Sequence, residues 1–362
     1  MGNNIQNIDK NFNTKSTIEK DGLSFYNAKN DPFCVYGLYD YKKQEIFRRL
    51  PEDVAIATNE GVAELSKNTA GGRVRFSTDS KVISISVKLN TINAIPNMPT
   101  SGTSGFDLFV DSPDGFESRY AGTFMPPVHA MEDGFESAIH FKTKKQRYIT
   151  INFPTYSGVS ELLIGISSDA ALGEGLQYKN TPPIVYYGSS ITQGACASRS
   201  GNNYQNIICR HLNMDYINLG FAGSGRGEDA ICDYMASLKM SAFVSDYDHN
   251  APTVEHLENT HYKLYQKIRA AHPDIPYIMI SKCDIDSNPT NLERRLVISE
   301  SYKKAVENGD NNVYYIDGSS VYRGRFQGMC TVDNIHPNDL GFSLLAEAIE
   351  GELQRAFTQS NL

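Results

Sequence analysis

The chain has 362 residues, of which 40% are hydrophobic and 21% are charged, a composition typical of a folded protein and not of a disordered chain. This length predicts two domains or one large one. With 34 Lys and Arg against 42 Asp and Glu, the net charge of −8 argues against non-specific binding to nucleic acid or to an anionic membrane. No apolar run approaches 18 residues, so no membrane-spanning helix is predicted.

The first 24 residues form a polar N-terminal segment without the apolar stretch of a secretory signal, so we expect a cytoplasmic protein. None of the six cysteines forms a Cys-x-x-Cys pair, which predicts reduced, mostly buried thiols and no zinc cluster. These cysteines are Cys34, Cys196, Cys209, Cys232, Cys283 and Cys330.

Residues 25–170 carry the pattern of β-structure. Apolar and polar residues alternate over 83–89, 106–110 and 149–153. An alternation of period two places one face of each strand in a core and the other in water, as in antiparallel sheets. We therefore predict an accessory β-sandwich, jelly-roll-like, over residues 25–170.

A polar stretch rich in Gly and Pro at 171–183 predicts a linker, after which the pattern changes. Short apolar runs, predicted as strands, occur at 184–188, 214–220, 241–247, 275–281 and 312–317. The segments between them include apolar stripes of helical period, for example from Thr253 and around Phe342. Residues 184–362 are therefore predicted to form a parallel sheet covered by helices on both faces, an α/β domain.

In such a sheet, ligands bind at the carboxyl ends of the strands, so the residues after each strand are the candidates for chemistry. The first predicted strand runs into Gly188-Ser189-Ser190-Ile191. Small residues at a strand-to-helix turn can expose a side chain above the sheet. Taken alone, however, this segment could equally be a tight turn with serines facing solvent.

The last predicted strand is followed by Asp333-Asn334-Ile335-His336-Pro337. A carboxylate three residues before a histidine can reach the imidazole, fix its tautomer and support the imidazolium. The alternative is that His336 only precedes the final helix at the surface.

Two further turns follow the second and third predicted strands. Gly223 lies in a glycine-rich turn, where a backbone N–H can approach a ligand closely. The alternatives are a plain loop or a phosphate cradle, although no Gly-Lys-Ser/Thr follows. Asn250 could donate its amide to an oxyanion or cap the next helix.

The order Ser, Gly, Asn, Asp-x-x-His over about 183–357 resembles the SGNH, or GDSL-type, hydrolase superfamily. Residues 188–191 are similar to the Gly-Asp-Ser-Leu block that contains the nucleophile. Gly223 resembles the oxyanion glycine, Asn250 the oxyanion asparagine, and Asp333 with His336 the last block.

The sequence departs from this pattern at two positions. Ser189 stands where the family usually has Asp, which bears on local hydrogen bonds more than on catalysis. Asn250 lies in Asp-His-Asn where the family has Gly-x-Asn-Asp.

In the first half, residues 105–109 (Gly-Phe-Asp-Leu-Phe) look like the Gly-x-Asp-Leu-Tyr motif of a β-sandwich that precedes some SGNH domains.

The resemblance implies a flavodoxin-like three-layer catalytic domain, with Ser190 as nucleophile, His336 as general base and Asp333 orienting the imidazole. The N–H groups of Ser190 and Gly223, with the Asn250 amide, would form the oxyanion hole. No metal or cofactor is implied. An α/β-hydrolase is disfavoured because Gly-x-Ser-x-Gly is absent and Asp and His lie too close in sequence.

The first hypothesis for function is an esterase that removes acetyl groups from imported oligosaccharides. The alternatives are an acyltransferase, a general short-chain esterase, or a non-catalytic SGNH scaffold that binds glycans. The expected partner is a small-molecule or oligosaccharide acyl ester, with neither nucleic acid nor membrane; homo-oligomerisation is left open. Because the linker is short and contains Pro182-Pro183, we also expect the sandwich to form one wall of the site.

Overall fold

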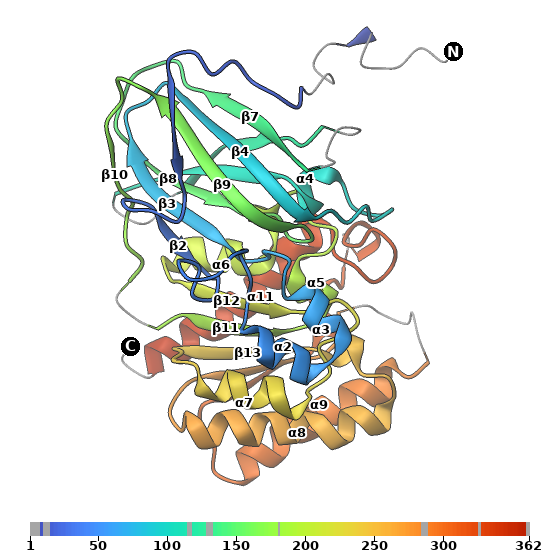
Figure 1. Ribbon diagram of the computed structural model, residues 1–362. Helices are drawn as coiled ribbons and strands as arrows, with labels where there is room; N and C mark the ends of the chain where they lie inside the picture. The colour runs from blue at the N-terminus through green and yellow to red at the C-terminus, as the bar shows by residue number, and fades with distance from the viewer. Residues whose placement is uncertain are drawn as a thin grey trace.

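The computed structural model describes residues 8–9, 15–113, 118–127, 133–179, 182–283, 289–324 and 327–359. Its first half contains two antiparallel sheets, drawn above the second half in Figure 1. One sheet has the order β1 (Leu23–Asn27), β9 (Gly158–Ser167), β4 (Val82–Thr91), β7 (Gly134–His140). The other has the order β10 (Leu172–Glu174), β3 (Arg73–Thr78), β8 (Arg147–Asn152), β5 (Phe106–Asp111), β6 (Ser118–Phe124), and β2 (Cys34–Tyr36) pairs with β3.

The core of the first half lies between these two sheets. Ile83, Ile85 and Val87 of β4 are buried against the other sheet, where Ile149 and Ile151 of β8 are also buried. Alternate residues of each strand thus enter one shared core, as the period-two pattern predicts. This arrangement confirms the predicted β-sandwich.

The second half contains a five-stranded parallel sheet in the order β12-β11-β13-β14-β15. Its strands are β11 (Ile184–Gly188), β12 (Tyr216–Gly220), β13 (Ala242–Asp246), β14 (Tyr277–Ile280) and β15 (Val313–Ile316). The first strand lies between the second and the third, so the strand order reverses beside it. The predicted flavodoxin-like α/β fold is confirmed, and the carboxyl ends of β11, β12 and β13 meet where ligands bind in such folds.

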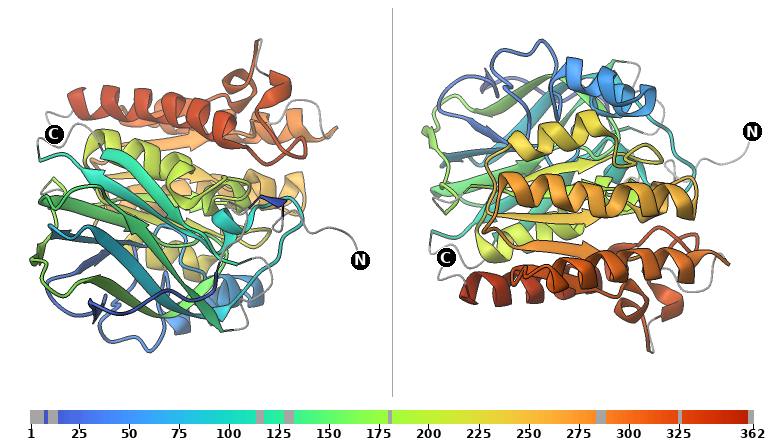
Figure 2. Two further views of the ribbon diagram at one scale, coloured as in Figure 1. Left: turned by 90° about the horizontal axis from the view of Figure 1, so that it is seen from above. Right: turned by 90° about the horizontal axis from the view of Figure 1, so that it is seen from below.

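Helices cover both faces of this sheet, as the view from below in Figure 2 shows. One face carries α6 (Tyr204–Leu212) and α11 (Asp339–Gln359), and the other carries α7 (Asp229–Ser237), α8 (Val254–Ala271) and α9 (Asn291–Glu307). Along β11, Val185 and Tyr187 face the second group, while Ile184 and Tyr186 face the first. Strands buried on both faces need this continuous apolar sequence.

Two short helices of the first half, α2 (Glu52–Thr58) and α3 (Glu60–Leu65), are not anticipated from the sequence. They lie beside α7 in Figure 1, and Ala55 and Val62 join the core that contains Leu219 and Ile231 of the second half. Helices of six or seven residues are too short for periodicity to identify, and only tertiary packing stabilises them. The first half therefore supplies part of the cover of the parallel sheet.

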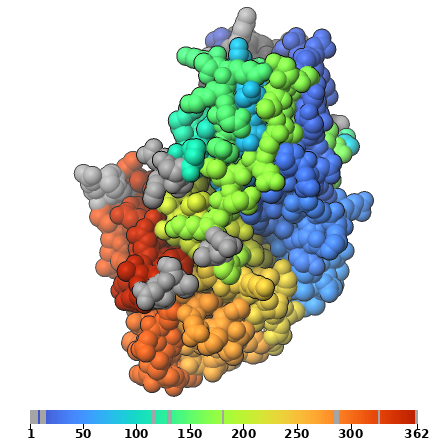
Figure 3. Space-filling view, turned by 90° about the vertical axis from the view of Figure 1, so that its left-hand side faces the viewer, coloured from blue at the N-terminus to red at the C-terminus, as the bar shows by residue number. Residues whose placement is uncertain are grey.

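Arg49 links the two halves at the end of β12. Its side chain is 1% exposed, and its guanidinium donates to the carbonyl oxygens of Leu65, Asn68, Asn218 and Gly220. Figure 3 shows the two halves in direct contact along their boundary. A buried guanidinium is tolerated only where its N–H groups find acceptors. This contact therefore requires that the two halves keep their relative position.

Within the described ranges, no helix combines the length and the apolarity that crossing a bilayer requires. Five of the six cysteines are buried, and Cys34 is half-buried.

Replacing Arg49 with Met should lower the free energy of unfolding by about 3 kcal/mol or more, since four carbonyl oxygens lose their donor at a buried boundary. Urea unfolding of the whole chain measures this. Arg355→Met is the matched control, because Arg355 pairs with Glu352 on the exposed side of α11 and should matter by less than about 1 kcal/mol. Equal effects of the two changes would contradict the role of Arg49.

Asp246, the last residue of β13, is a buried carboxyl beneath the turn that follows β11. It is 4% exposed, and Thr192 Oγ1 donates to its Oδ2 at 3.2 Å. Burial, with the neighbouring Asp248 charge, raises the pKa of Asp246 well above its ordinary value of 3.8. The folded protein therefore binds a proton at this carboxyl more tightly than the unfolded chain, which releases it near pH 4.

Stability should therefore fall as the pH rises above the unfolded pKa of Asp246, because the folded state binds more protons than the unfolded state. The slope that one proton contributes is at most about 1.4 kcal/mol per pH unit. Asp246→Asn should remove this slope, as seen by urea unfolding of both proteins between pH 5 and pH 8. Parallel pH profiles for the two proteins would show that Asp246 is ionised in the fold.

Candidate active site

The turn after β11 presents Ser190 and uses Ser189 internally. Ser189 is the N-cap of α5 (Ser190–Gln193), and its Oγ accepts a hydrogen bond from the N–H of Ile191 at 3.1 Å. Ser189 is fully buried, whereas Ser190 is half-buried at the start of the helix. A side chain at Gly188 would collide with the Asp246 carbonyl, so the turn requires glycine there. Of the two serines, only Ser190 is available to a ligand.

Ser190, His336 and Asp333 form one chain of hydrogen bonds, although 146 residues separate the serine from the histidine. Ser190 Oγ lies 2.9 Å from His336 Nε2, and His336 Nδ1 lies 2.7 Å from Asp333 Oδ2. The other carboxylate oxygen of Asp333 accepts the N–H groups of Ile335 and His336 at 3.1 and 2.8 Å. The three residues predicted as nucleophile, base and orienting acid are thus brought together.

The electrostatics of this chain suit proton transfer. Partial burial raises the pKa of Asp333, but the hydrogen bonds from the backbone and ring of His336 outweigh it and lower this pKa to about 2. An ionised Asp333 holds the proton on Nδ1, which leaves Nε2 to accept the Ser190 hydroxyl proton. The side chains of His336 and Asp333 remain 23% and 33% exposed, so the site is open to solvent.

Gly223 and Asn250, the other two residues predicted for the oxyanion hole, lie together but bond to each other. The Gly223 N–H donates to Asn250 Oδ1 at 3.0 Å. Asn250 Nδ2 donates to the carbonyls of Phe221 and Gly225 at 2.8 and 3.1 Å. In this arrangement Asn250 braces the 221–225 turn, and the donor role of the pair stays a prediction. The Ser190 N–H lies in the first turn of α5, where helices leave N–H groups without an intrahelical partner.

Two residues of the first half contact this site and were missed by sequence reasoning. Asn97 Nδ2 donates to Asp333 Oδ2 at 2.7 Å, and Tyr156 Oη lies 3.4 Å from the carbonyl oxygen of Ser190. No motif marks either residue. The one available signal is that Pro96 and Pro99 flank the Asn97 segment, which indicates a restrained loop.

Among the described residues, two clusters bring three potential metal ligands within reach of one another. In the first, Cys196 lies beside Asp333 and His336, and burial with the Asp333 charge raises the pKa of its thiol to about 12. A protonated thiol is a poor ligand. In the second cluster, His249 lies with the buried carboxyl groups of Asp246 and Asp248.

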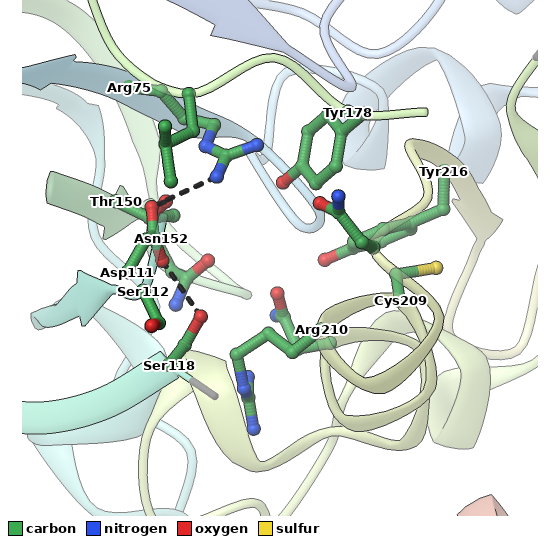
Figure 4. Close-up of a pocket in the computed structure, with 13 residues that line it drawn as sticks. Arg75, Asp111, Ser112, Ser118, Thr150, Asn152, Tyr178, Cys209, Arg210 and Tyr216 are labelled. Atoms are coloured by element: carbon green, nitrogen blue, oxygen red, sulfur yellow. Dashed lines mark hydrogen bonds and ion pairs between the residues drawn. The ribbon is translucent and has the colours of Figure 1, made fainter. Parts of the chain in front are cut away.

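A separate polar cavity lies between the two halves, away from Ser190. Arg75, Asp111 and Thr150 of the sandwich face Tyr216 and Arg210 of the α/β layer across it in Figure 4. Its volume of about 20 Å³ has room for roughly one water molecule. Such a cavity fits solvent between packed surfaces and is too small for an acyl ester.

The two halves match two family profiles. Residues 181–354 match the GDSL-like lipase/acylhydrolase family, and residues 23–172 match the N-terminus of SGNH-hydrolase-type esterases. The second match covers the sandwich that contains the Gly-Phe-Asp-Leu-Phe segment. Among curated proteins, none matches the sequence significantly.

Solved structures with both halves are similar over nearly their full length. A crystal structure described as a GDSL-like lipase from Bacteroides ovatus is 25% identical, with a TM-score of 0.83, over 93% of this chain and 98% of that one. The salicylyl-acyltransferase SsfX3 from a tetracycline biosynthetic pathway is 20% identical, with a TM-score of 0.73, over 92% and 98%. The acetyl xylan esterase Est2A from Butyrivibrio proteoclasticus is 14% identical, with a TM-score of 0.59, over 93% and 99%.

The similarity to SsfX3 and to Est2A, at 20% and 14% identity, concerns the fold alone. The α/β half matches a GDSL-type hydrolase profile, and the sandwich matches the profile of the region that precedes such domains. The chain therefore belongs to the SGNH (GDSL-type) hydrolase superfamily, in the two-domain form with a GxDLY-type N-terminal region.

Proposed function

We propose that this protein is a serine esterase that removes acetyl or other short acyl groups from carbohydrates through an acyl-enzyme. The observation that supports this most directly is the hydrogen-bond chain from Ser190 Oγ through His336 to Asp333. A hydroxyl within 2.9 Å of an imidazole whose other nitrogen faces a carboxylate is the arrangement that activates a serine nucleophile.

In the proposed mechanism, Ser190 Oγ attacks the ester carbonyl carbon as His336 Nε2 takes the hydroxyl proton. The resulting imidazolium, held by Asp333, returns that proton to the departing sugar oxygen, which leaves an acetyl-Ser190 ester. A water molecule then attacks this ester, with His336 again acting as base, and acetate leaves. These steps use side chains and water alone.

The proposed oxyanion hole consists of the Ser190 N–H, the Gly223 N–H and the Asn250 amide. The Ser190 N–H is the donor that the geometry favours first, because it lies at the amino end of α5 beside the nucleophile. Gly223 and Asn250 would contribute after the Asn250 carboxamide turns away from the turn that it braces. A side chain built at Gly223, which has φ +66°, would meet no atom within 4 Å, so there is space above this turn.

Three features favour a carbohydrate ester as substrate. The exposed positions of His336 and Asp333 suit a large polar substrate more than a fatty acyl chain, which would require an apolar tunnel. Among structures of this two-domain fold, Est2A is described as an acetyl xylan esterase. A net charge of −8 also favours a neutral glycan over a polyanion.

An acyltransferase is the second candidate, because the two-domain fold of SsfX3 resembles this chain with a TM-score of 0.73. The two candidates differ only in the second step, where a hydroxyl compound replaces water as the acceptor. Acetylated xylan and mannan oligosaccharides incubated with and without added alcohols separate them. Release of free acetate that alcohols do not divert supports hydrolysis, and preferential formation of a new ester supports transfer.

Ser190→Ala should lower hydrolysis of p-nitrophenyl acetate by several orders of magnitude and abolish labelling by a fluorophosphonate, since no other described serine pairs with His336. The single label on the unmodified protein should map to Ser190. Ser189→Ala is the matched control. It removes an N-cap worth about 1 kcal/mol of stability and should keep much of the activity.

Full activity of Ser190→Ala, or a label on another residue, would refute Ser190 as nucleophile. A wild-type protein that neither reacts with the fluorophosphonate nor hydrolyses any ester, yet binds glycans, would support the non-catalytic scaffold instead.

Asn250→Ala should lower kcat by roughly 100- to 1,000-fold with little change in KM if the amide stabilises the oxyanion. It should also lower the Tm, because the 221–225 turn loses three hydrogen bonds. Steady-state kinetics and thermal unfolding of the same preparation separate the two roles. Asn308→Ala, which removes one bond to Tyr262 Oη at the end of α9, is the control. A lower Tm with kcat intact would leave Asn250 only as a brace.

A further inference from the structure

Asn97 crosses from the sandwich to the hydrogen-bond chain of the α/β layer. It lies between β4, which ends at Thr91, and α4 (Thr100–Thr103). Its Nδ2 donates to Asp333 Oδ2 at 2.7 Å, a contact between residues 236 positions apart. The same Oδ2 accepts the Nδ1 proton of His336, also at 2.7 Å. One carboxylate oxygen is therefore shared between the imidazole and an amide from the other half of the chain.

The two oxygens of Asp333 are held in different ways. Oδ1 accepts two backbone N–H groups of its own turn, those of Ile335 and His336. Those bonds alone leave the carboxylate able to tilt about Oδ1, and Asp333 is 33% exposed, so water can compete for Oδ2. Asn97 supplies a second donor to Oδ2, beside His336 Nδ1, and so restrains the direction from which Oδ2 faces His336.

The segment that carries Asn97 is itself anchored on both sides. The Asn97 carbonyl oxygen lies 3.5 Å from Cys196 Sγ, which donates to it. The next residue, Met98, is buried with Tyr156, Ala195 and Cys196 in a small apolar cluster between the halves. On the sandwich side, Asn93 Nδ2 donates to the Tyr156 carbonyl at 2.7 Å. A donor fixed in this way loses little freedom when it bonds Asp333.

The chemistry of an amide suits this position. A Lys or Arg side chain would neutralise the carboxylate and weaken its support of the imidazolium. A neutral amide donates one hydrogen bond and leaves the negative charge of Asp333 in place. The contact therefore orients the carboxylate without cancelling its charge.

We propose that Asn97 is a positioning residue for the Asp333–His336 pair, so that the sandwich completes the active site of the α/β layer. This inference rests on the proposed esterase function. Asn97 does not touch the reacting atoms and acts through Asp333. The sandwich thereby becomes part of the catalytic apparatus, and a detached α/β layer would lack one donor to its orienting acid.

Asn97→Ala should lower kcat for p-nitrophenyl acetate by about 10- to 100-fold and leave KM nearly unchanged, because a misdirected imidazole affects the transition state more than binding. Asn97→Asp, of the same size, removes the donor and repels Asp333, so its loss should be larger. Asn97→Gln keeps an amide and should recover part of the activity. Ser101→Ala is the control, since it removes another bond between the halves, to the Ser198 carbonyl, away from Asp333.

The decisive measurement is a double-mutant cycle with Asp333→Ala. If Asn97 acts through Asp333, then Asn97→Ala should change kcat less than about twofold once Asp333 is absent. A loss of 10-fold or more that persists in the Asp333→Ala background would overturn the proposal, as would full activity of Asn97→Ala.

A second readout does not require turnover. In proton NMR, the low-field resonance of the His336 Nδ1 proton should shift or broaden in Asn97→Ala and stay unchanged in Ser101→Ala. An unaltered resonance in Asn97→Ala would overturn the proposal. A wild-type protein without hydrolysis or fluorophosphonate labelling would refute the esterase function, whereas this resonance would still report whether Asn97 holds the pair.

Discussion

Two buried arginines from the first half of the chain hold β12 at both of its ends. Arg73 forms an ion pair with Asp215, donates to the Tyr216 carbonyl and stacks on the Tyr216 ring with its guanidinium 3.8 Å from the centroid. Arg49 donates to the Gly220 carbonyl at the other end of the strand. Burying a guanidinium group costs free energy unless its N–H groups are hydrogen-bonded. These two arginines therefore favour one position of the sandwich on the parallel sheet.

The position of the sandwich on the sheet determines which loops meet at the carboxyl ends of the strands. With β12 held, the turn after β11 faces the loop between β4 and α4, and a small apolar cluster that includes Met98, Tyr156 and Cys196 closes the boundary beside Ser190. The site is thus built on one side by the turns of the α/β layer and on the other by the sandwich. An active site at such a boundary can vary its substrate through sandwich loops while its nucleophile and base remain in place.

The candidate site also shows how buried polar groups are distributed beneath partly exposed residues. Asp333 and His336 are partly open to solvent and satisfy each other. Below them, Asp246 lies in the sheet with Thr192 as its partner, and Gln193 accepts the Ala222 N–H and donates to the Thr155 carbonyl. These buried bonds hold the turns rigid, and a rigid turn keeps a serine and an imidazole within hydrogen-bond distance.

Local pattern predicts part of the fold, and together with the family resemblance it names the residues of the candidate site. Period-two alternation identifies β4, β5 and β8 of the sandwich, and runs of apolar residues identify the five strands of the parallel sheet, because burial on one or both faces shapes the sequence pattern. The spacing of Asp333 and His336 is short enough for one turn to bring them together, and Ser190 follows the first strand of a sheet whose ligand edge is known from its topology.

Contacts across long stretches of sequence were decided only by the tertiary structure. Nothing near Asn97 indicates that it meets a carboxylate 236 positions later, and nothing in Asp-His-Asn indicates that the Asn250 amide bonds Gly223. Helices α2 and α3 are too short to be recognised before they pack on the sheet. Sequence pattern indicates whether a residue is buried and which local hydrogen bonds it can form. The distant partner of a polar side chain depends instead on the relative position of the two halves.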